Sequence, residues 1–124
     1  MSDRNLDVVR GAYESFSQGD VPAVLGTLAE DVVWTVPPPL PQAVEAHGRS
    51  EVGAFFQRLV GIWEGFNVEV DDFVASGDRV CVIGRGSGRV DGHDAGYGFV
   101  HCWQLADGRA VRFDEYASPG PELL

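Results

Sequence analysis

Apolar residues at the start of the chain recur at intervals of three and four positions, a spacing that places them on one face of a helix. The apolar face of this first helix consists of Leu6, Val9, Tyr13 and Phe16. Gly19 is placed to end the helix, and Asp20 is placed to cap a second one that has Pro22 in its first turn. The buried side of the second helix carries Val24, Leu25 and Leu28. The chain is therefore predicted to open with two consecutive helices.

The next part of the chain changes from an extended pattern to a helical one. Residues 32–36 are β-branched or aromatic and predict a strand, which ends at the prolines that follow because proline cannot continue a strand ladder. Residues 37–48 are expected to form a loop, long enough to be a lid or a pocket wall. A third helix is expected from Ser50, its N-cap, to Gly65, which ends it. Its apolar positions are Phe55, Phe56, Leu59, Ile62 and Trp63.

The remainder of the chain is predicted to form strands separated by turns. The strands are expected at about 66–75, 79–90, 95–105 and 110–117. Glycines alternate at Gly84, Gly86 and Gly88, which is typical of a bend or bulge that curls a sheet. The order of helix, helix, strand, helix and four strands predicts one α+β domain over residues 1–124. A curled antiparallel sheet would carry the helices on one side.

The amino-acid composition excludes several classes of enzyme and argues against two kinds of partner. The chain has nine basic residues, all of them arginine, against nineteen acidic ones, for a formal charge of −10. Without lysine, a Schiff-base aldolase, a pyridoxal-phosphate enzyme anchored through lysine and a Walker-type phosphate loop are excluded, because each needs a primary amine. The acidity argues against nucleic acid or an anionic membrane surface as a partner, since both are bound by clustered positive charge.

Other features indicate a protein of the cytoplasm. The apolar runs are only a few residues long, so no membrane span is expected, and the first residues lack the pattern of a secretion signal. Cys81 and Cys102 both fall inside predicted strands. We interpret them as two reduced thiols of the core rather than as a disulfide or a metal site.

Short motifs at the boundaries of the predicted elements resemble a known family. They are Gly19-Asp20, Ala29-Glu30-Asp31 before Val33-Trp34, His47-Gly48-Arg49, Val100-His101-Cys102-Trp103, Asp107-Gly108-Arg109 and Phe113-Asp114-Glu115-Tyr116. Over nearly the whole chain this series resembles the SnoaL-like proteins of the nuclear-transport-factor-2-like (NTF2-like), ketosteroid-isomerase-like superfamily. The resemblance implies a cone-shaped α+β barrel of the NTF2-like or cystatin-like kind, in which a strongly curved antiparallel sheet and three helices enclose a pocket. It also implies a homodimer.

The resemblance is specific for the fold and not for an activity. The superfamily contains isomerases, polyketide cyclases, dehydratases, epoxide hydrolases and non-catalytic members. In its ketosteroid isomerases a tyrosine and two aspartates carry the chemistry, and those positions fall here on Ala12, Val36 and His101. Steroid isomerisation by that mechanism is not expected, although the third position keeps an ionisable side chain.

The last predicted hairpin contains the sharpest candidate for chemistry. If Leu105 faces Val111, the two-residue period of a strand sets Trp103 opposite Phe113 and His101 opposite Glu115. The histidine and the glutamate would then point together into an aromatic interior. A carboxylate beside an imidazole holds one tautomer and stabilises the imidazolium, which prepares a general base. The alternative is a structural cross-strand pair within a hydrogen-bond network.

Aromatic residues and one hydroxyl complete the candidate site. Tyr13 is a candidate oxyanion donor, with a core tyrosine as the alternative. Seven aromatic residues are candidates for an apolar ligand wall, although most must also belong to the core. They are Trp34, Phe55, Trp63, Tyr97, Phe99, Trp103 and Phe113. Arg85, Ser87 and Arg89 share the opposite face of their strand and are interpreted as solvated.

No cofactor is expected. Asp91, His93 and Asp94 have side chains that can bind a metal, but turn chemistry accounts for this cluster, so no metal site is predicted. Motifs of serine hydrolases, dinucleotide-binding proteins and zincins are missing from the sequence.

Two functions remain open. The first is a cofactor-independent isomerase, cyclase or dehydratase acting on a small hydrophobic carbonyl compound, polyketide-like or steroid-like. In this enzyme His101 moves a proton, Glu115 orients the imidazole of His101, and Tyr13 or a backbone donor stabilises the enolate. The second is a non-catalytic module that binds a hydrophobic ligand or only dimerises, and the missing aspartate at Val36 favours it.

Overall fold

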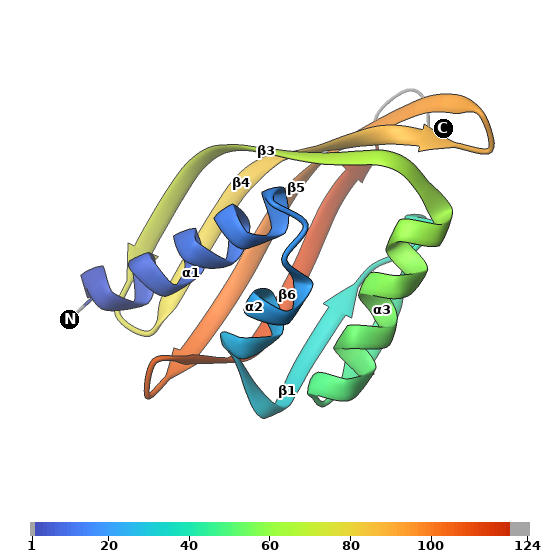
Figure 1. The fold of residues 1–124 in the computed structure, drawn as a ribbon. Helices are drawn as coiled ribbons and strands as arrows, with labels where there is room; N and C mark the ends of the chain where they lie inside the picture. The colour runs from blue at the N-terminus through green and yellow to red at the C-terminus, as the bar shows by residue number, and fades with distance from the viewer. Residues whose placement is uncertain (1, 120–124) are drawn as a thin grey trace.

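The structure, a computed structural model, describes residues 2–119 and contains three helices and six strands (Figure 1). The helices are α1 (Ser2–Ser17), α2 (Val21–Gly26) and α3 (Arg49–Ile62). The strands are β1 (Leu28–Val36), β2 (Val44–His47), β3 (Trp63–Ser76), β4 (Arg79–Val90), β5 (His93–Ala106) and β6 (Arg109–Pro119). The predicted α+β class and the run of four C-terminal strands are confirmed.

All six strands form one sheet in the order β2-β1-β6-β5-β4-β3. Neighbours are antiparallel except β1 and β6, which are parallel. The predicted curved antiparallel sheet is confirmed, with one parallel pairing that was not predicted, because the pattern of a strand does not encode its partner. The prediction that 37–48 is entirely loop was wrong, since β2 lies within it and pairs with the end of β1.

The helix boundaries differ from the predicted ones in three places. Gly48, with φ of 89°, is the N-cap of α3 and makes no side-chain hydrogen bond, whereas Ser50 lies inside the helix. The helix ends at Ile62, so Trp63 begins β3. Leu28, expected on the buried side of the second helix, is the first residue of β1 and is fully buried.

The glycines of β4 make room for aromatic rings on the inner face of the sheet. A Cβ atom at Gly84 would lie 2.8 Å from the Phe99 ring, and one at Gly86 would lie 2.8 Å from the Tyr97 ring. The neighbouring strand β3 has bulges between Glu64 and Asn67 and between Val70 and Asp72. The predicted curl is thus confirmed, with the bulges in the strand beside the glycines.

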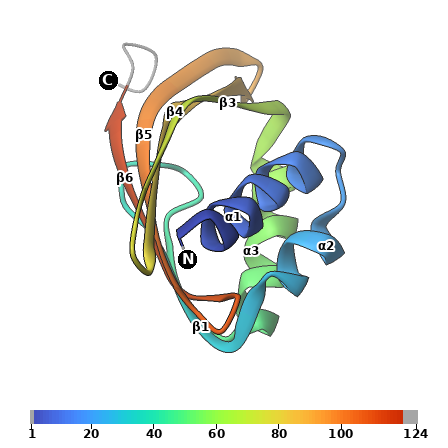
Figure 2. The same ribbon diagram turned by 90° about the vertical axis from the view of Figure 1, so that its left-hand side faces the viewer.

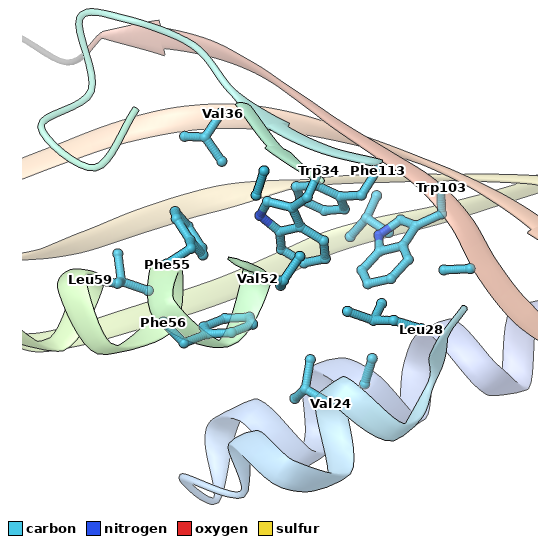
Figure 3. Close-up of a cluster of buried hydrophobic side chains, with 14 of the residues drawn as sticks. Val24, Leu28, Trp34, Val36, Val52, Phe55, Phe56, Leu59, Trp103 and Phe113 are labelled. Atoms are coloured by element: carbon cyan, nitrogen blue, oxygen red, sulfur yellow. The ribbon is translucent and has the colours of Figure 1, made fainter. Parts of the chain in front are cut away.

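The curved sheet carries all three helices on one side, as Figure 2 shows from the edge. Aromatic and aliphatic side chains from β1, α3 and the C-terminal hairpin fill the space between the two layers (Figure 3). The opposite face of the sheet is polar where Arg85 bonds to Glu69 and Asp71, as interpreted from the sequence. Elsewhere on that face Ile83 and Tyr116 are exposed, at 41% and 60%.

Candidate active site

A cavity lies between the concave face of the sheet and the helices. Its volume is about 70 Å³, counted as the space open to the centre of a water molecule. Its apolar lining consists of Ala12, Phe16, Val24, Trp34, Val36, Phe55, Phe56, Leu59, Phe66, Val68, Trp103 and Phe113. Its polar lining consists of Tyr13, Gln42, Tyr97, His101 and Glu115. A cavity of this kind, mostly apolar with a few converging polar groups, is typical of a small-molecule site.

His101 and Glu115 face each other across β5 and β6, in the predicted register. Both residues are buried, at 8% and 6% exposed. His101 Nε2 lies 3.1 Å from Glu115 Oε2, within ion-pair distance. The atoms are not aligned for a hydrogen bond, and Glu115 Oε2 has no hydrogen-bond partner among the described residues. A buried carboxylate oxygen without a partner is costly, and this oxygen keeps the capacity to accept a hydrogen bond.

The predicted partner of Leu105 was wrong: Leu105 pairs with Ala110 and not with Val111. A bulge between Gln104 and Leu105 shifts the register by one residue next to the turn. The shift is confined to the end of the hairpin. Trp103 still pairs with Phe113, so the candidate pair is unaffected.

The Tyr13 hydroxyl, from α1, connects the imidazole to an indole. It accepts a hydrogen bond from Trp103 Nε1 at 3.0 Å and lies 2.5 Å from His101 Nδ1. A hydroxyl that accepts from the indole still has its own proton to donate, and we infer that Tyr13 directs this proton at Nδ1. The imidazole then carries its hydrogen on Nε2, facing Glu115. In this arrangement the Tyr13 proton is engaged with His101 and is not free for a ligand oxygen.

The position of the imidazole ring is fixed by aromatic neighbours. Phe99 stacks on it with ring centroids 3.7 Å apart and an angle of 6° between the planes. Phe113 contacts it at 4.8 Å between centroids. The side chains that face the ligand space are therefore pre-organised by packing, which a catalytic pair requires.

Burial keeps the two phenols at this site neutral. Burial raises the pKa of Tyr13 well above its ordinary value, and the negative charge of Glu115 raises it further. The pKa of Tyr97 is raised strongly by burial and, after that, by the same carboxylate. Both side chains therefore act as hydrogen-bonding hydroxyls and not as phenolates over the usual range of pH.

Five of the seven aromatic residues proposed for the ligand wall line the cavity: Trp34, Phe55, Tyr97, Trp103 and Phe113. Trp63 and Phe99 are outside the lining. Phe99 lies behind His101, and Trp63 donates from Nε1 to Gln42 Oε1 at 2.9 Å.

Sequence reasoning missed Gln42, the buried polar residue of the proline-rich loop. Its side chain accepts from Trp63 and donates to the Tyr97 hydroxyl at 3.2 Å, and it is only 1% exposed. Arg58 of α3 donates to the Gln42 carbonyl at 3.0 Å. The loop is thereby tied into the wall of the cavity. No local pattern marks Gln42, because a glutamine among prolines is typical of an exposed loop.

Phe16, Phe56 and Phe66 were also missed as lining residues, although the first two lie on the predicted helix faces.

Neither a metal cluster nor a membrane span is found in the described part of the chain. Among residues 2–119 no three His, Cys, Asp or Glu side chains come together as a metal site. No helix in that range is long and apolar enough to cross a membrane. Cys81 and Cys102 are free thiols on paired strands, with their sulfur atoms 3.9 Å apart.

Comparison with known proteins assigns this geometry to a family. A protein of unknown function from Burkholderia pseudomallei, described as NTF2-like, shares 35% of its residues with this chain, with a TM-score of 0.86 over 93% of this chain and 91% of the other. TerC, crystallised with polyporic acid, is 24% identical, with a TM-score of 0.84 over 93% and 92% of the two chains. A protein from Sinorhizobium meliloti described as a putative polyketide cyclase is 20% identical, with a TM-score of 0.75 over 89% and 94%. The last two likenesses show the fold alone.

The curated proteins include no match to this chain. The model of the SnoaL-like domain matches residues 9–113. That range runs from the first helix to the aromatic residue of β6 beside Glu115, and so covers most of the cavity wall. The chain therefore belongs to the family of SnoaL-like domains, within the NTF2-like superfamily.

Proposed function

We propose that this protein is a cofactor-independent acid–base enzyme that acts on a small hydrophobic carbonyl compound. The observation that carries the proposal is a buried carboxylate, Glu115, which lies beside His101 in an apolar cavity and has an oxygen atom without a hydrogen-bond partner. Apart from two neutral phenols, this carboxylate and this imidazole are the ionisable groups in the lining. Proton transfer is the chemistry that such a pair supports.

In this proposal Glu115 is the group that takes the proton, and His101 supports it. Nδ1 of the imidazole is engaged by Tyr13, and Nε2 lies 3.1 Å from Glu115 Oε2 without forming a hydrogen bond, so the carboxylate has free acceptor capacity. The roles are thus exchanged relative to the order expected from the sequence, while the three residues remain the same. Tyr13 holds the imidazole tautomer instead of binding the enolate oxygen.

The proposed step balances without a cofactor. The C–H bond next to the carbonyl breaks, its proton forms an O–H bond with Glu115, and its electron pair moves through the new C=C bond onto the carbonyl oxygen. Return of the proton to another carbon gives isomerisation. Attack of the enolate carbon on a second carbonyl, whose oxygen takes the proton back from Glu115, gives cyclisation. Loss of a β-hydroxyl group as water, with the proton from Glu115 and with re-formation of the carbonyl, gives dehydration.

The apolar lining makes this step favourable for a hydrophobic substrate. Aromatic rings around Glu115 exclude water, so the carboxylate is weakly solvated and every charge interaction at the site is strengthened. Two proteins of the same fold are consistent with this class of ligand, namely TerC crystallised with polyporic acid and the putative polyketide cyclase from Sinorhizobium meliloti. We accordingly infer a polyketide-like or steroid-like substrate.

A non-catalytic ligand-binding module is the second candidate. Val36, at the position where ketosteroid isomerases have an aspartate base, lines the cavity and supplies no ionisable group. In this case Glu115 would only accept a hydrogen bond from a bound hydroxyl. The two candidates differ in whether a carbon-bound hydrogen of the ligand is exchanged.

Exchange of hydrogen at carbon tests the proposal. β-Tetralone, a flat apolar ketone with acidic hydrogens next to its carbonyl, is incubated in D₂O with the protein, and loss of its α-hydrogen signal is followed by NMR. We expect exchange above the buffer rate, and we expect Glu115→Gln to lower the protein-dependent rate by about 10²-fold or more. Equal rates for wild type and Glu115→Gln would overturn the proposal.

The chain offers a matched control for this assay. His47 and Glu45 form a second histidine–glutamate pair, with Nε2 and Oε2 2.9 Å apart, but both side chains are more than half exposed. Glu45→Gln removes the same carboxylate from an open surface and is expected to leave the exchange rate unchanged. If Glu45→Gln lowered the rate as much as Glu115→Gln, the effect would not belong to the cavity.

We also propose that the protein is a homodimer of the cytoplasm. The exposed apolar residues Val74, Ile83 and Tyr116 lie on the strands of the sheet, and a second copy would cover them. Sedimentation at micromolar concentration should give the mass of a dimer. A monomer at that concentration would contradict the dimer and leave the acid–base proposal intact.

A further inference from the structure

We propose that the indole Nε1–H of Trp34 is the hydrogen-bond donor that holds the carbonyl oxygen of the ligand and so makes the cavity selective for ketones. This inference rests on the proposed function, because it names the donor that would act opposite Glu115. Trp34 lies on β1, 4% exposed, and lines the cavity. Its nitrogen is buried and has no hydrogen-bond partner among the described residues.

The other two tryptophans show how unusual this nitrogen is. Trp63 Nε1 donates to Gln42 at 2.9 Å, and Trp103 Nε1 donates to Tyr13 at 3.0 Å. Both of those donors are used within the protein. A buried donor without an acceptor costs folding free energy, so a polar group that is retained in such a place is a candidate for binding a ligand.

The indole of Trp34 is held rigidly by its neighbours. It stacks on Phe113 with ring centroids 3.8 Å apart and 14° between the planes, and it meets the Trp103 ring edge-on at 5.8 Å. On the other side it contacts Phe55 and Phe56 at 6.0 and 5.7 Å between centroids. The ring cannot turn its nitrogen toward another acceptor without breaking these contacts. In Figure 3 that nitrogen is directed toward the side of the cavity where Phe55 and Val36 lie.

The sheet register places this donor near the carboxylate. Trp34 pairs with Phe113, and Glu115 follows Phe113 by two residues on the same face of β6. Two residues along a strand span about 7 Å. The backbones of the two residues are therefore close enough for their side chains to approach the oxygen and the α-carbon of one small ketone. Negative charge that develops on the oxygen during proton removal would strengthen the bond to Trp34.

A pair of probes that differ only in the carbonyl group tests this donor. β-Tetralone and tetralin share one carbon skeleton, and their binding is measured by NMR titration against wild type and Trp34→Phe. The phenylalanine keeps an aromatic ring on Phe113 and removes the N–H. We expect Trp34→Phe to weaken β-tetralone by roughly ten- to a hundredfold and to change tetralin by much less. Tyr116→Phe, which changes an aromatic side chain that is 60% exposed and outside the lining, serves as the control and should leave the ratio of the two affinities unchanged.

The outcomes separate this inference from the proposed function. Equal loss of both probes in Trp34→Phe would show that only packing was changed and would overturn the role of the donor, while hydrogen exchange by Glu115 would be untouched. Failure of both probes to bind the wild-type protein would overturn the donor and the proposed ligand class together. If Trp34→Phe does not fold, the Trp34 Nε1–H resonance of the wild-type protein decides. We expect it to shift on addition of β-tetralone and not of tetralin, and an equal shift with both probes would overturn the inference.

Discussion

The hydroxyl of Tyr13 joins three elements of the site, and its removal tests whether they act as one unit. In Tyr13→Phe the ring remains, but Trp103 Nε1–H loses its acceptor and His101 Nδ1 loses its neighbour at 2.5 Å. Two hydrogen bonds contribute about 1 kcal/mol each, and a buried donor left without a partner costs about 1–3 kcal/mol. Because these contributions overlap, we expect the free energy of unfolding to fall by about 2–3 kcal/mol.

Urea denaturation and thermal melting measure this loss. An unfolding entropy of about 2.1 cal/mol/K per residue gives roughly 0.26 kcal/mol/K for a chain of this length, so the expected loss corresponds to roughly 8–12 °C in Tm. Tyr116→Phe is the matched control, because that side chain is 60% exposed and its change should stay within about 0.5 kcal/mol.

An unchanged or raised stability would contradict this role of the hydroxyl. If Tyr13→Phe is as stable as wild type, or more stable, the hydroxyl does not satisfy the indole and the imidazole. It would then be a polar group buried at a cost, and Tyr13 would not fix the tautomer of His101.

Three further predictions concern the walls of the cavity. Gly86→Ala places a Cβ atom 2.8 Å from the Tyr97 ring and should lower the free energy of unfolding, measured by urea denaturation, by about 1–3 kcal/mol. Gly98→Ala, where a Cβ atom would have no neighbour within 4 Å, should be neutral or stabilising, and equal effects of the two variants would contradict the close packing at Gly86. Gln42→Ala removes the acceptor of the Trp63 indole and should cost about 2 kcal/mol, measured by Tm; an unchanged Tm would show that the loop is not tied down by this side chain. The raised pKa values of the two buried phenols mean that above pH of about 10 the unfolded chain loses protons that the folded chain keeps. Their contribution to stability is complete below that pH and is lost as the pH rises toward the folded-state values, so a urea midpoint that stays constant up to pH 11 would contradict their burial.

Much of the fold was predictable because its signals are local. The spacing of apolar residues located α1 and α3, and turn residues located the ends of β3, β4 and β5. The parallel pairing of β1 with β6 was not predictable from such signals, since it depends on the path of the whole chain. Strand β2 was missed because it has only four residues, too few for a period to be recognised.

At the site, the facing pair His101 and Glu115 followed from the period of the hairpin alone, and the bulge near the turn did not disturb it. The partners of these side chains could not be predicted in the same way. Tyr13 and His101 are 88 residues apart in the sequence, and their contact depends on how α1 crosses the sheet. The unpaired nitrogen of Trp34 is a property of packing, because no pattern of residues reveals that a donor has been left without an acceptor.

In the proposed reaction the carboxylate of Glu115 meets the reacting carbon of a carbonyl compound inside the cavity. A crystal structure of the protein with β-tetralone bound would show whether this contact forms. We expect the ketone between the aromatic walls, with a carbon next to the carbonyl within about 3–3.5 Å of a Glu115 oxygen. A ketone bound in the cavity with that carbon turned away from Glu115, or bound only outside the cavity, would contradict the proposed reaction.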